Sequence, residues 1–280
     1  MNRLYAYLYD DFLADRQYDR ALANLETRTS ALGIHGRHAR LAIFRSAKEL
    51  VEGLVREGAE TIVVVGNDHS LMKTMWFLPS MNVTVGYIPV AEPHGIAEML
   101  GIPAGDDACD VLAGRRIETV DIGMLGDRFF LTEVYVDSTK ASVDIDGYFR
   151  ISPQKLGTIS IRNLGSVTAE GATSNARDGW LEVVIRPVDP EEGSRKFKFL
   201  WKPKLMQETR LLLQKGSIIS DEPIDIVVDG YKINGFRFEL GVIPKKLKLI
   251  TGRKKKLDPS QEDLSNRAFL GTFTPAENRK

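Results

Sequence analysis

Up to about residue 120, short apolar runs alternate with stretches in which apolar residues recur at helical spacing. The apolar runs predict strands over residues 4–9, 39–44, 61–65 and 83–89. The amphipathic stretches predict helices over residues 16–32, 46–57 and 70–77. The run at 61–65 is entirely β-branched, which is typical of a parallel strand buried on both faces. Strands that alternate with helices predict right-handed crossovers and a mostly parallel sheet.

The second predicted helix carries its own start and stop signals. Ser46 and Glu49 have the spacing of a capping box, with Ser46 as N-cap and Glu49 at the third helical position. Gly58 follows the last apolar residues of the helix and is a suitable C-terminal stop. These signals support a helix between two strands of an α/β domain.

The pattern changes near Asp121, and the following runs are short, β-rich and interrupted by Gly, Asp, Asn and Pro. They predict strands over residues 157–161, 180–186, 196–201, 224–228 and 236–242. Such spacing is typical of an antiparallel sandwich or meander. We therefore predict an α/β domain at 1–122, an antiparallel β-sandwich domain at 123–250 and a basic, flexible or loosely docked tail at 251–280.

Composition narrows the class of protein further. With 43% hydrophobic and 27% charged residues, the 280-residue chain can build packed cores, which excludes global disorder. Its 38 basic and 38 acidic residues argue against a dedicated nucleic-acid binder. The single Cys109 excludes a disulfide framework and a multi-cysteine zinc site. Because no signal segment or membrane-length apolar run is present, we expect a soluble cytoplasmic protein.

The ends of two predicted strands carry the candidate chemistry. Ligands of open parallel sheets lie outside the carboxyl ends of the strands. Residues 63–70 and 85–95 each combine a strand, a Gly, small polar residues and a helix start, which is the general form of a phosphate loop. The local pattern fits equally an ordinary turn in which Asp68 or Ser70 caps the next helix.

Several motifs follow one another in a recognisable order along the chain. They comprise Gly86, Ile88 and Pro89; Ala97 with Leu100-Gly101-Ile102-Pro103; Val120-Asp121-Ile122-Gly123; Arg128-Phe129-Phe130-Leu131; Asn163; Asp178-Gly179-Trp180-Leu181-Glu182-Val183; and Val227-Val228-Asp229-Gly230. In order and spacing they resemble the diacylglycerol kinase catalytic-domain family of lipid kinases, which is related to NAD kinases. The resemblance covers about residues 4–250.

The resemblance implies a two-domain fold whose last segment returns to the first domain. It also implies that ATP, with Mg²⁺, binds in the cleft and that a lipid hydroxyl accepts the γ-phosphoryl group. The nucleotide-contacting positions would be Gly66, Asn67, Asp68, Ser70, Glu92 and His94. Asp178 matches a family Asp that is associated with magnesium.

The chain departs from the family at the positions that carry the chemistry. The family's Gly-Gly-Asp-Gly-Thr is here the segment 66–70, in which His69 adds bulk where a phosphate would pass. The family's Gly-Thr-x-Asn-Asp is here the segment 91–95, in which Glu92 adds negative charge. Asp10 and Asp11 replace a phosphate-friendly turn after the first strand. These changes oppose the positioning and charge neutralisation on which phosphoryl transfer depends.

The position of the family's general base is also altered. Tyr231 stands where the family has the Glu of Asp-Gly-Glu, and an unperturbed Tyr with a pKa of about 10 is a poor base at neutral pH. Asp229 is the nearest carboxylate that could substitute. We therefore expect a degenerate, weakly active or inactive relative that binds a lipid, a small molecule or a protein partner in the old cleft. An active Mg-ATP-dependent lipid kinase is the alternative, and a different reaction on the same scaffold is a third reading.

Two further features allow ligand hypotheses. His69 and His94, together with Asp68 and Glu92, offer two imidazoles and two carboxylates, a set suited to zinc, although surface residues that fill a vacated pocket explain them equally. We expect all four to lie close together at the carboxyl edge of the sheet. The residues Lys245, Lys246, Lys248, Arg253, Lys254, Lys255 and Lys256 form a basic cluster that is either a solvated end or a contact for an anionic membrane surface. The sequence leaves the oligomeric state open.

Overall fold

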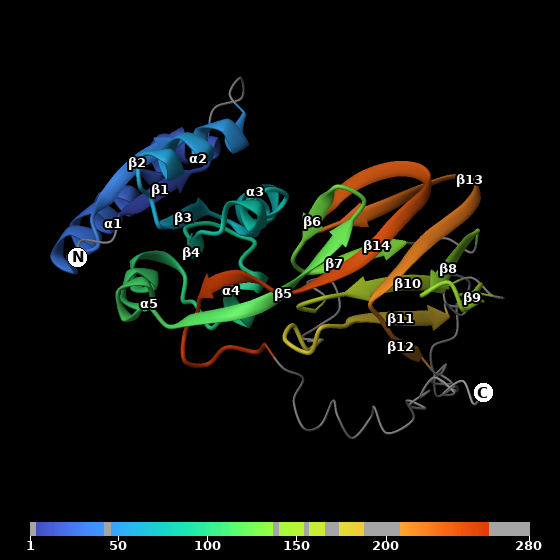
Figure 1. Ribbon diagram of the computed structural model, residues 1–280. Coiled ribbons are helices and arrows are strands. Elements are labelled where there is room, and N and C mark those ends of the chain that lie inside the picture. The colour runs from blue at the N-terminus through green and yellow to red at the C-terminus, as the bar shows by residue number, and fades with distance from the viewer. Residues whose placement is uncertain are drawn as a thin grey trace, which may run out of the picture.

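A computed structural model describes residues 4–41, 46–136, 140–153, 157–165, 174–187 and 208–257. The predicted fold class is confirmed, because an α/β domain is followed by a β-rich domain (Figure 1). The strands of both domains are hydrogen-bonded into one mixed sheet, in which the path β12-β11-β10-β7-β13-β14-β4-β3-β1-β2 connects the two ends.

The first domain is built on four parallel strands: β1 (Tyr5–Tyr9), β2 (Gly36–Arg40), β3 (Thr61–Gly66) and β4 (Thr84–Pro89). Its α-helices are α1 (Asp19–Ala31), α2 (Ala47–Arg56), α3 (Asp68–Met75), α4 (Gly95–Met99) and α5 (Ala108–Gly114). Short 3-10 turns are η1 (Asp11–Ala14), η2 (Arg16–Tyr18), η3 (Leu78–Met81) and η4 (Gly105–Asp107). Every residue of β1, β3 and β4 is buried, which explains their continuous apolar sequences.

Local signals explain where several of these helices begin and end. The Ser46 side chain accepts a hydrogen bond from the Glu49 amide, and α2 ends just before Gly58, which adopts a φ of 98°. The prediction for residues 16–32 was wrong at its start, because residues 16–18 form a 3-10 turn and α1 begins at Asp19. The strand predicted at 39–44 is instead Gly36–Arg40, whose polar sequence hid it. Residues 42–45 lie outside the described residues.

The second domain contains β5 (Ile117–Leu125), β6 (Arg128–Phe130), β7 (Glu133–Val136), β8 (Ala141–Ile145), β9 (Phe149–Ile151), β10 (Gly157–Arg162), β11 (Leu181–Pro187), β12 (Thr209–Leu213), β13 (Lys215–Val228) and β14 (Tyr231–Ile250). Apart from its hairpin partner β14, the strand β13 pairs with two further strands at different points along its length. Its first half pairs with β8, and its last residues pair with β7. The strand predicted at 196–201 lies outside the described residues.

The long strand β14 belongs to both domains. It starts in a hairpin with β13, pairs with β5 along its second half, and runs parallel to β4 at Lys248 and Leu249. The predicted boundary at Ile122 falls inside β5. The structure has two hydrophobic cores. One lies around the parallel strands and their helices, and the other lies between the strands of the β-rich domain.

The segment predicted as a tail is docked over its first seven residues. Thr251 and Leu257 are buried, and the backbone amides of Gly252 and Lys256 donate to the carbonyls of Leu100 and Met99. The expectation of a loose extension was wrong for 251–257, because backbone bonds to the end of α4 hold a segment whose side chains are mostly charged. Residues 258–280 lie outside the described residues.

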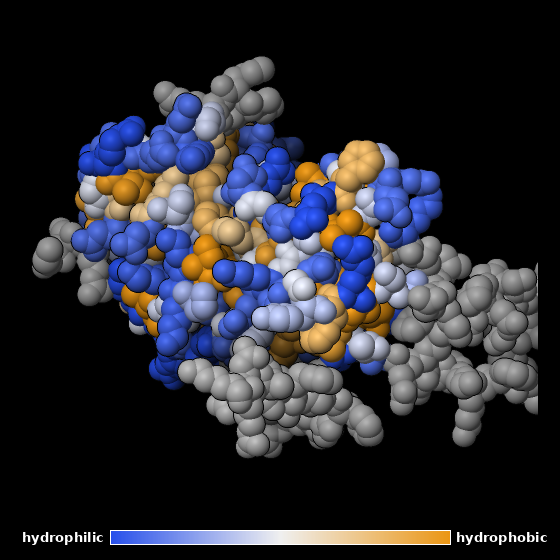
Figure 2. Space-filling model, turned by 45° about the vertical axis from the view of Figure 1, so that its right-hand side comes forward, coloured by the Kyte–Doolittle hydropathy of each residue, from blue (hydrophilic) through white to orange (hydrophobic). Residues whose placement is uncertain are grey.

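The described helices include none that is long and apolar enough to cross a membrane. On the face drawn in Figure 2, hydrophilic residues predominate and hydrophobic residues gather in small groups between them. The large hydrophobic side chains that are exposed in the described part of the chain are Ile117, Tyr148, Phe149, Leu212 and Phe236.

Candidate functional site

The loops after β3 and β4 leave the same edge of the parallel sheet and are bonded to each other. Gly66 pairs with Pro89 at the ends of the two strands. The amide of Val90 donates to the Gly66 carbonyl at 2.7 Å, and the side-chain amide of Asn67 donates to the Glu92 carbonyl at 3.0 Å. The two predicted phosphate-type loops therefore form one closed unit at the carboxyl edge.

The start of α3 is capped by its own loop. Asn67, rather than Asp68 or Ser70, is the N-cap: its side-chain oxygen accepts from the Ser70 amide at 3.1 Å. The Ser70 hydroxyl in turn accepts from the Asn67 amide at 3.1 Å, which completes a capping box. The amide of Asp68 donates to the Pro93 carbonyl at 2.8 Å. The amides of Asp68 and Ser70, which an incoming phosphate would need, are thus already bonded within the protein.

Asp68 is fully buried and connects the loop after β3 to α4, the helix that follows the loop after β4. Its carboxylate accepts from the Tyr87 hydroxyl at 3.1 Å and from the Ile96 amide, near the start of α4, at 2.9 Å. Burial raises the pKa of this carboxyl, while the bonds from Ile96 and Tyr87 oppose the rise. The side chain acts as a bridge between loops and faces neither solvent nor an open cleft.

Two acidic residues follow β1 at the same edge. The Asp10 amide donates to the Val65 carbonyl at 3.1 Å, and its side chain accepts from the Asp11 amide at 2.7 Å. Burial raises the pKa of Asp10, and the hydrogen bond between the two side chains lowers the pKa of Asp11. The ammonium of the exposed Lys73 acts on both carboxyls and partly offsets their charge.

The two histidines of the hypothetical metal site point to different partners. His94 lies 3.1 Å from a Glu92 oxygen and 3.8 Å from a Glu98 oxygen, whereas the ring of His69 lies beside Gly230 of the other domain. Within the described residues, no group of three or more His, Cys, Asp or Glu side chains is placed to hold a metal ion. The four side chains that we expected together are therefore only partly assembled.

The position of the family's general base is occupied by an interdomain contact. The Tyr231 hydroxyl donates to the His69 carbonyl at 3.2 Å, and its ring meets Trp76 edge-on at 5.0 Å. The Arg128 guanidinium in turn stacks over the Trp76 ring, with its central carbon 4.6 Å from the ring centroid. Burial, followed by the charges of Asp10 and Asp229, raises the pKa of Tyr231. This phenol joins α3 to the β13–β14 hairpin and is less able to take up a proton-accepting role than a free tyrosine.

Asp229, the substitute base suggested by the sequence, is enclosed. Its carboxylate accepts from the amides of Leu131, Thr132 and Glu133 at 2.7, 2.8 and 3.3 Å, and from the Thr132 hydroxyl at 2.6 Å. Burial raises the pKa of this carboxyl, and the four donors oppose the rise. Asp229 fixes the turn before β7 to the β13–β14 hairpin.

Asp121 has a structural importance that the sequence did not reveal. Its buried carboxylate accepts from the Gly179 amide at 2.7 Å and from the Lys245 amide at 2.8 Å. The Asn163 side chain donates to the carbonyls of Asp121 and Leu131. The one available signal was an acidic residue between two apolar neighbours, Val120 and Ile122. The predicted magnesium position, Asp178, is exposed, and its side chain accepts from the Trp180 amide at 3.0 Å.

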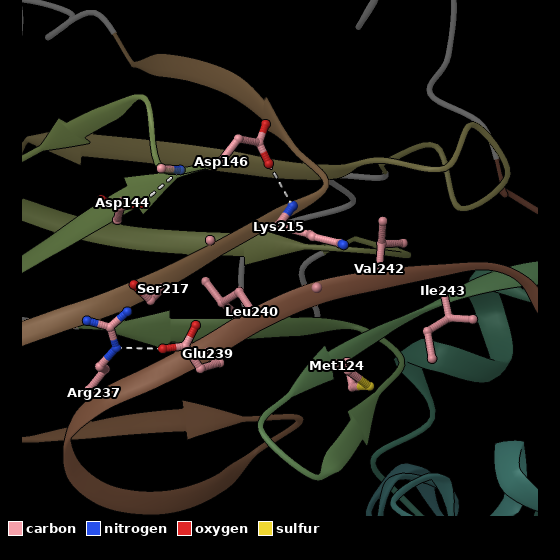
Figure 3. A pocket seen from close by; sticks show the side chains of 13 residues that line it. Met124, Asp144, Asp146, Lys215, Ser217, Arg237, Glu239, Leu240, Val242 and Ile243 are labelled. Carbon is pink, nitrogen blue, oxygen red and sulfur yellow. Dashed lines mark hydrogen bonds and ion pairs between the residues drawn. The ribbon is translucent and has the colours of Figure 1, made fainter.

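The second domain contains a hollow of about 600 Å³ that the sequence did not predict. Figure 3 shows its lining side chains, which come from β5, β8, β13, β14 and the β8–β9 turn. Much of its polar lining is already paired: Arg237 bonds to Glu239 at 2.5 Å, and Asp146 accepts from the Lys215 amide at 2.9 Å. This hollow lies away from the loops that resemble a nucleotide site.

ATP and Mg²⁺ are the groups that the family resemblance implies, and the residues present do not fit them. The amides of Asp68 and Ser70 are bonded internally, the Asp68 carboxylate is buried against Tyr87, and Asp10, Asp11 and Glu92 surround the edge with negative charge.

Comparison with known proteins identifies the fold. No family model matches the sequence, and no curated protein matches it. A crystal structure described as a diacylglycerol kinase from Bacillus anthracis has a TM-score of 0.71 at 12% identity, covering 90% of this chain and 97% of that one. Two described as putative diacylglycerol kinases from the same organism have TM-scores of 0.71 and 0.70, at 11% and 12% identity, and cover 90% and 89% of this chain and 97% of each of theirs. The chain therefore has a diacylglycerol kinase-like fold, as the order of its motifs predicted.

Proposed function

We propose that this chain is a catalytically silent relative of the lipid kinases, whose former nucleotide site no longer takes ATP. The observation that carries the proposal is the internal capping of α3. Phosphate recognition at a helix start needs free amide donors, and here Pro93 and Asn67 already accept from the Asp68 and Ser70 amides.

Charge supports the same conclusion. A polyphosphate at this edge would approach Asp10, Asp11 and Glu92, and Lys73 is the cation that acts on the first two. Phosphoryl transfer relies on neutralising charge on the transferred group. An excess of carboxylates at the edge opposes both ATP binding and the transition state.

The placement of the two candidate bases is the third support. The Tyr231 hydroxyl donates a hydrogen bond to a carbonyl, and Asp229 accepts four hydrogen bonds inside the second domain. General-base catalysis is typically worth about 10²–10⁴-fold, so its loss alone removes most of the rate.

The alternative is an active Mg-ATP-dependent lipid kinase. It is favoured by the retention of Asp68 at the family's carboxylate position and by a fold that covers 97% of the diacylglycerol kinase structures. This function would require the Asn67–Ser70 cap and the Asp68–Pro93 bond to open when the nucleotide binds.

A thermal-shift titration with Mg-ATP, run beside a phosphorylation assay with radiolabelled ATP and a panel of diacylglycerols, separates the two functions. We expect no shift and no turnover. A functional nucleotide site, at a ligand concentration of 100 times Kd, would add about 2.7 kcal/mol of stability. The variant Glu92→Thr, His94→Asn, Gly95→Asp restores the family residues of the second loop, and a shift gained by it would mean that this loop, and not the cap of α3, excludes the nucleotide.

Turnover by the natural chain would contradict the proposal if Asp68→Asn abolished it. Asp68→Asn is a suitable control, because an Asn at 68 can still accept from the Ile96 amide and bond to the Tyr87 hydroxyl. Loss of activity would then report on chemistry and not on unfolding.

A further inference from the structure

The segment 251–257 forms a strap that is fixed to the α/β domain. The Thr251 amide donates to the Arg116 carbonyl at 2.9 Å, and the Gly252 amide donates to the Leu100 carbonyl at 2.9 Å. A Cβ on Gly252 would lie 1.7 Å from the Gly101 carbonyl oxygen, so the two backbones are in direct contact. The charged side chains on this strap therefore have a fixed position on the surface.

Exposed cations gather on the strap and on the strand ends beside it. We call this set the basic belt; its members are Arg116, Lys245, Lys246, Lys248, Arg253, Lys254 and Lys256. Within the described residues, none of the seven takes part in an ion pair, whereas their neighbour Lys255 bonds to Glu118 at 2.5 Å. The chain as a whole has a formal net charge of zero, so the basic belt is a local concentration of positive charge.

An exposed aliphatic side chain lies within this positive region. Ile117 is 41% exposed and pairs with Ile250, directly before the strap, while Thr119, two residues further along β5, pairs with Lys248. The first half of β5 is hydrogen-bonded to β14 on one side, and over this stretch no other described strand pairs with it. Ile117 thus has Arg116 beside it in the chain and the strand that carries Lys248 beside it in the sheet, and the strap begins at the Arg116 carbonyl.

We propose that the basic belt docks this protein on an anionic lipid surface. Each Lys or Arg near such a surface contributes about 1 kcal/mol, roughly a fivefold gain in partitioning per cation. A set of exposed cations without ion-pair partners in the described residues, together with the exposed Ile117, suits a plane of acidic headgroups above hydrocarbon. Single-stranded nucleic acid binding would instead require aromatic platforms for the bases, and the exposed hydrophobic side chain beside the basic belt, Ile117, is aliphatic. This docking does not depend on whether the cleft binds a nucleotide.

The experiment is co-sedimentation of the full chain with two kinds of vesicle: phosphatidylcholine alone, and phosphatidylcholine with 30% phosphatidylglycerol. At low salt we expect binding to the anionic vesicles only, and release as ionic strength rises. The variant Lys246→Gln, Lys248→Gln, Arg253→Gln, Lys254→Gln should bind on the order of 10²–10³-fold more weakly. All four side chains are exposed, so its thermal midpoint should equal that of the natural chain.

A matched control removes the same number of cations elsewhere. Arg16, Arg20, Lys48 and Arg56 are exposed on the α/β domain outside the basic belt, and changing all four to Gln should leave vesicle binding within a few-fold. Equal loss in both variants would mean that net charge and not the basic belt drives binding, which overturns the proposal. Failure to bind anionic vesicles at low salt would also overturn it, as would binding to nucleic acid or an acidic protein with none to vesicles. Should the fourfold variant fold poorly, Arg253→Gln with Lys254→Gln alone should still weaken binding by roughly 25-fold.

Discussion

The two domains each contain a buried aspartate next to a kinase-like motif, and the two side chains are held in different ways. Asp68 accepts from the Ile96 amide and from a tyrosine hydroxyl, and the Ala97 amide also acts on its carboxyl. Asp229 accepts from three backbone amides and a threonine hydroxyl. A hydroxyl can also accept a hydrogen bond, whereas an amide can only donate. The first position is therefore exchangeable for a neutral residue, and the second requires two acceptor oxygens.

The largest effect that we predict is the contrast between Asn substitutions at these two sites. Asp229→Asn places an NH₂ group against backbone donors and leaves at least one of them without a partner, so we expect the free energy of unfolding to fall by about 3 kcal/mol. Asp68→Asn should change it by less than about 1 kcal/mol, because its amide can donate to the Tyr87 hydroxyl. Urea unfolding at pH 7 measures both. Equal losses would show that burial, and not the donor set, distinguishes the sites.

Gly66 tests how tightly the closed loops are packed. A Cβ at this position would lie 2.2 Å from the Ser70 hydroxyl oxygen and 3.3 Å from the Asp10 Cβ. Gly66→Ala should therefore destabilise the protein by about 1–3 kcal/mol. Because the severe contact is with the Ser70 side chain, Ser70→Gly in the same chain should cost less than it does alone. A double-mutant cycle by urea unfolding measures this coupling, and strict additivity would contradict the packing described.

The surroundings of Asp68 show which parts of the site could be predicted from the sequence and which could not. The β-branched run of β3 and the motif of β4 placed both strands, and parallel topology then brought residues 66–70 and 89–95 to one edge. The partners of Asp68 were not accessible, because Tyr87 and Ile96 reach it through packing of separate elements. The contact between Tyr231 and His69 spans 162 positions and leaves no local trace. The docking of 251–257 depends on backbone hydrogen bonds, and these cannot be predicted from the side-chain composition of the segment.

Tyr231 provides a smaller test, between the two domains. Tyr231→Phe removes the bond to the His69 carbonyl but keeps the ring against Trp76, so we expect a loss of about 1 kcal/mol. Tyr231→Ala removes both contacts and should lose more, with a change in tryptophan fluorescence as Trp76 becomes exposed. Unfolding by urea, followed by fluorescence, measures the two variants together. A larger effect for Phe than for Ala would contradict the arrangement of this contact.

The smallest predicted effect is the pH dependence that Asp68 alone contributes. Its carboxyl has a pKa of about 3.9 in the unfolded chain, and burial raises that pKa in the folded protein. Between these two values the folded state binds more protons than the unfolded state, so stability falls as pH rises through this window and is constant above it. Asp68→Asn has no proton to lose, and the variant should therefore gain stability relative to the natural chain between pH 4 and the raised pKa. Paired urea titrations from pH 4 to pH 7 measure that difference, in which the contributions of Asp10 and Asp229 cancel. A difference that shrinks with rising pH would mean that the bonds from Ile96 and Tyr87 outweigh burial and that Asp68 is a stabilised anion in the folded protein.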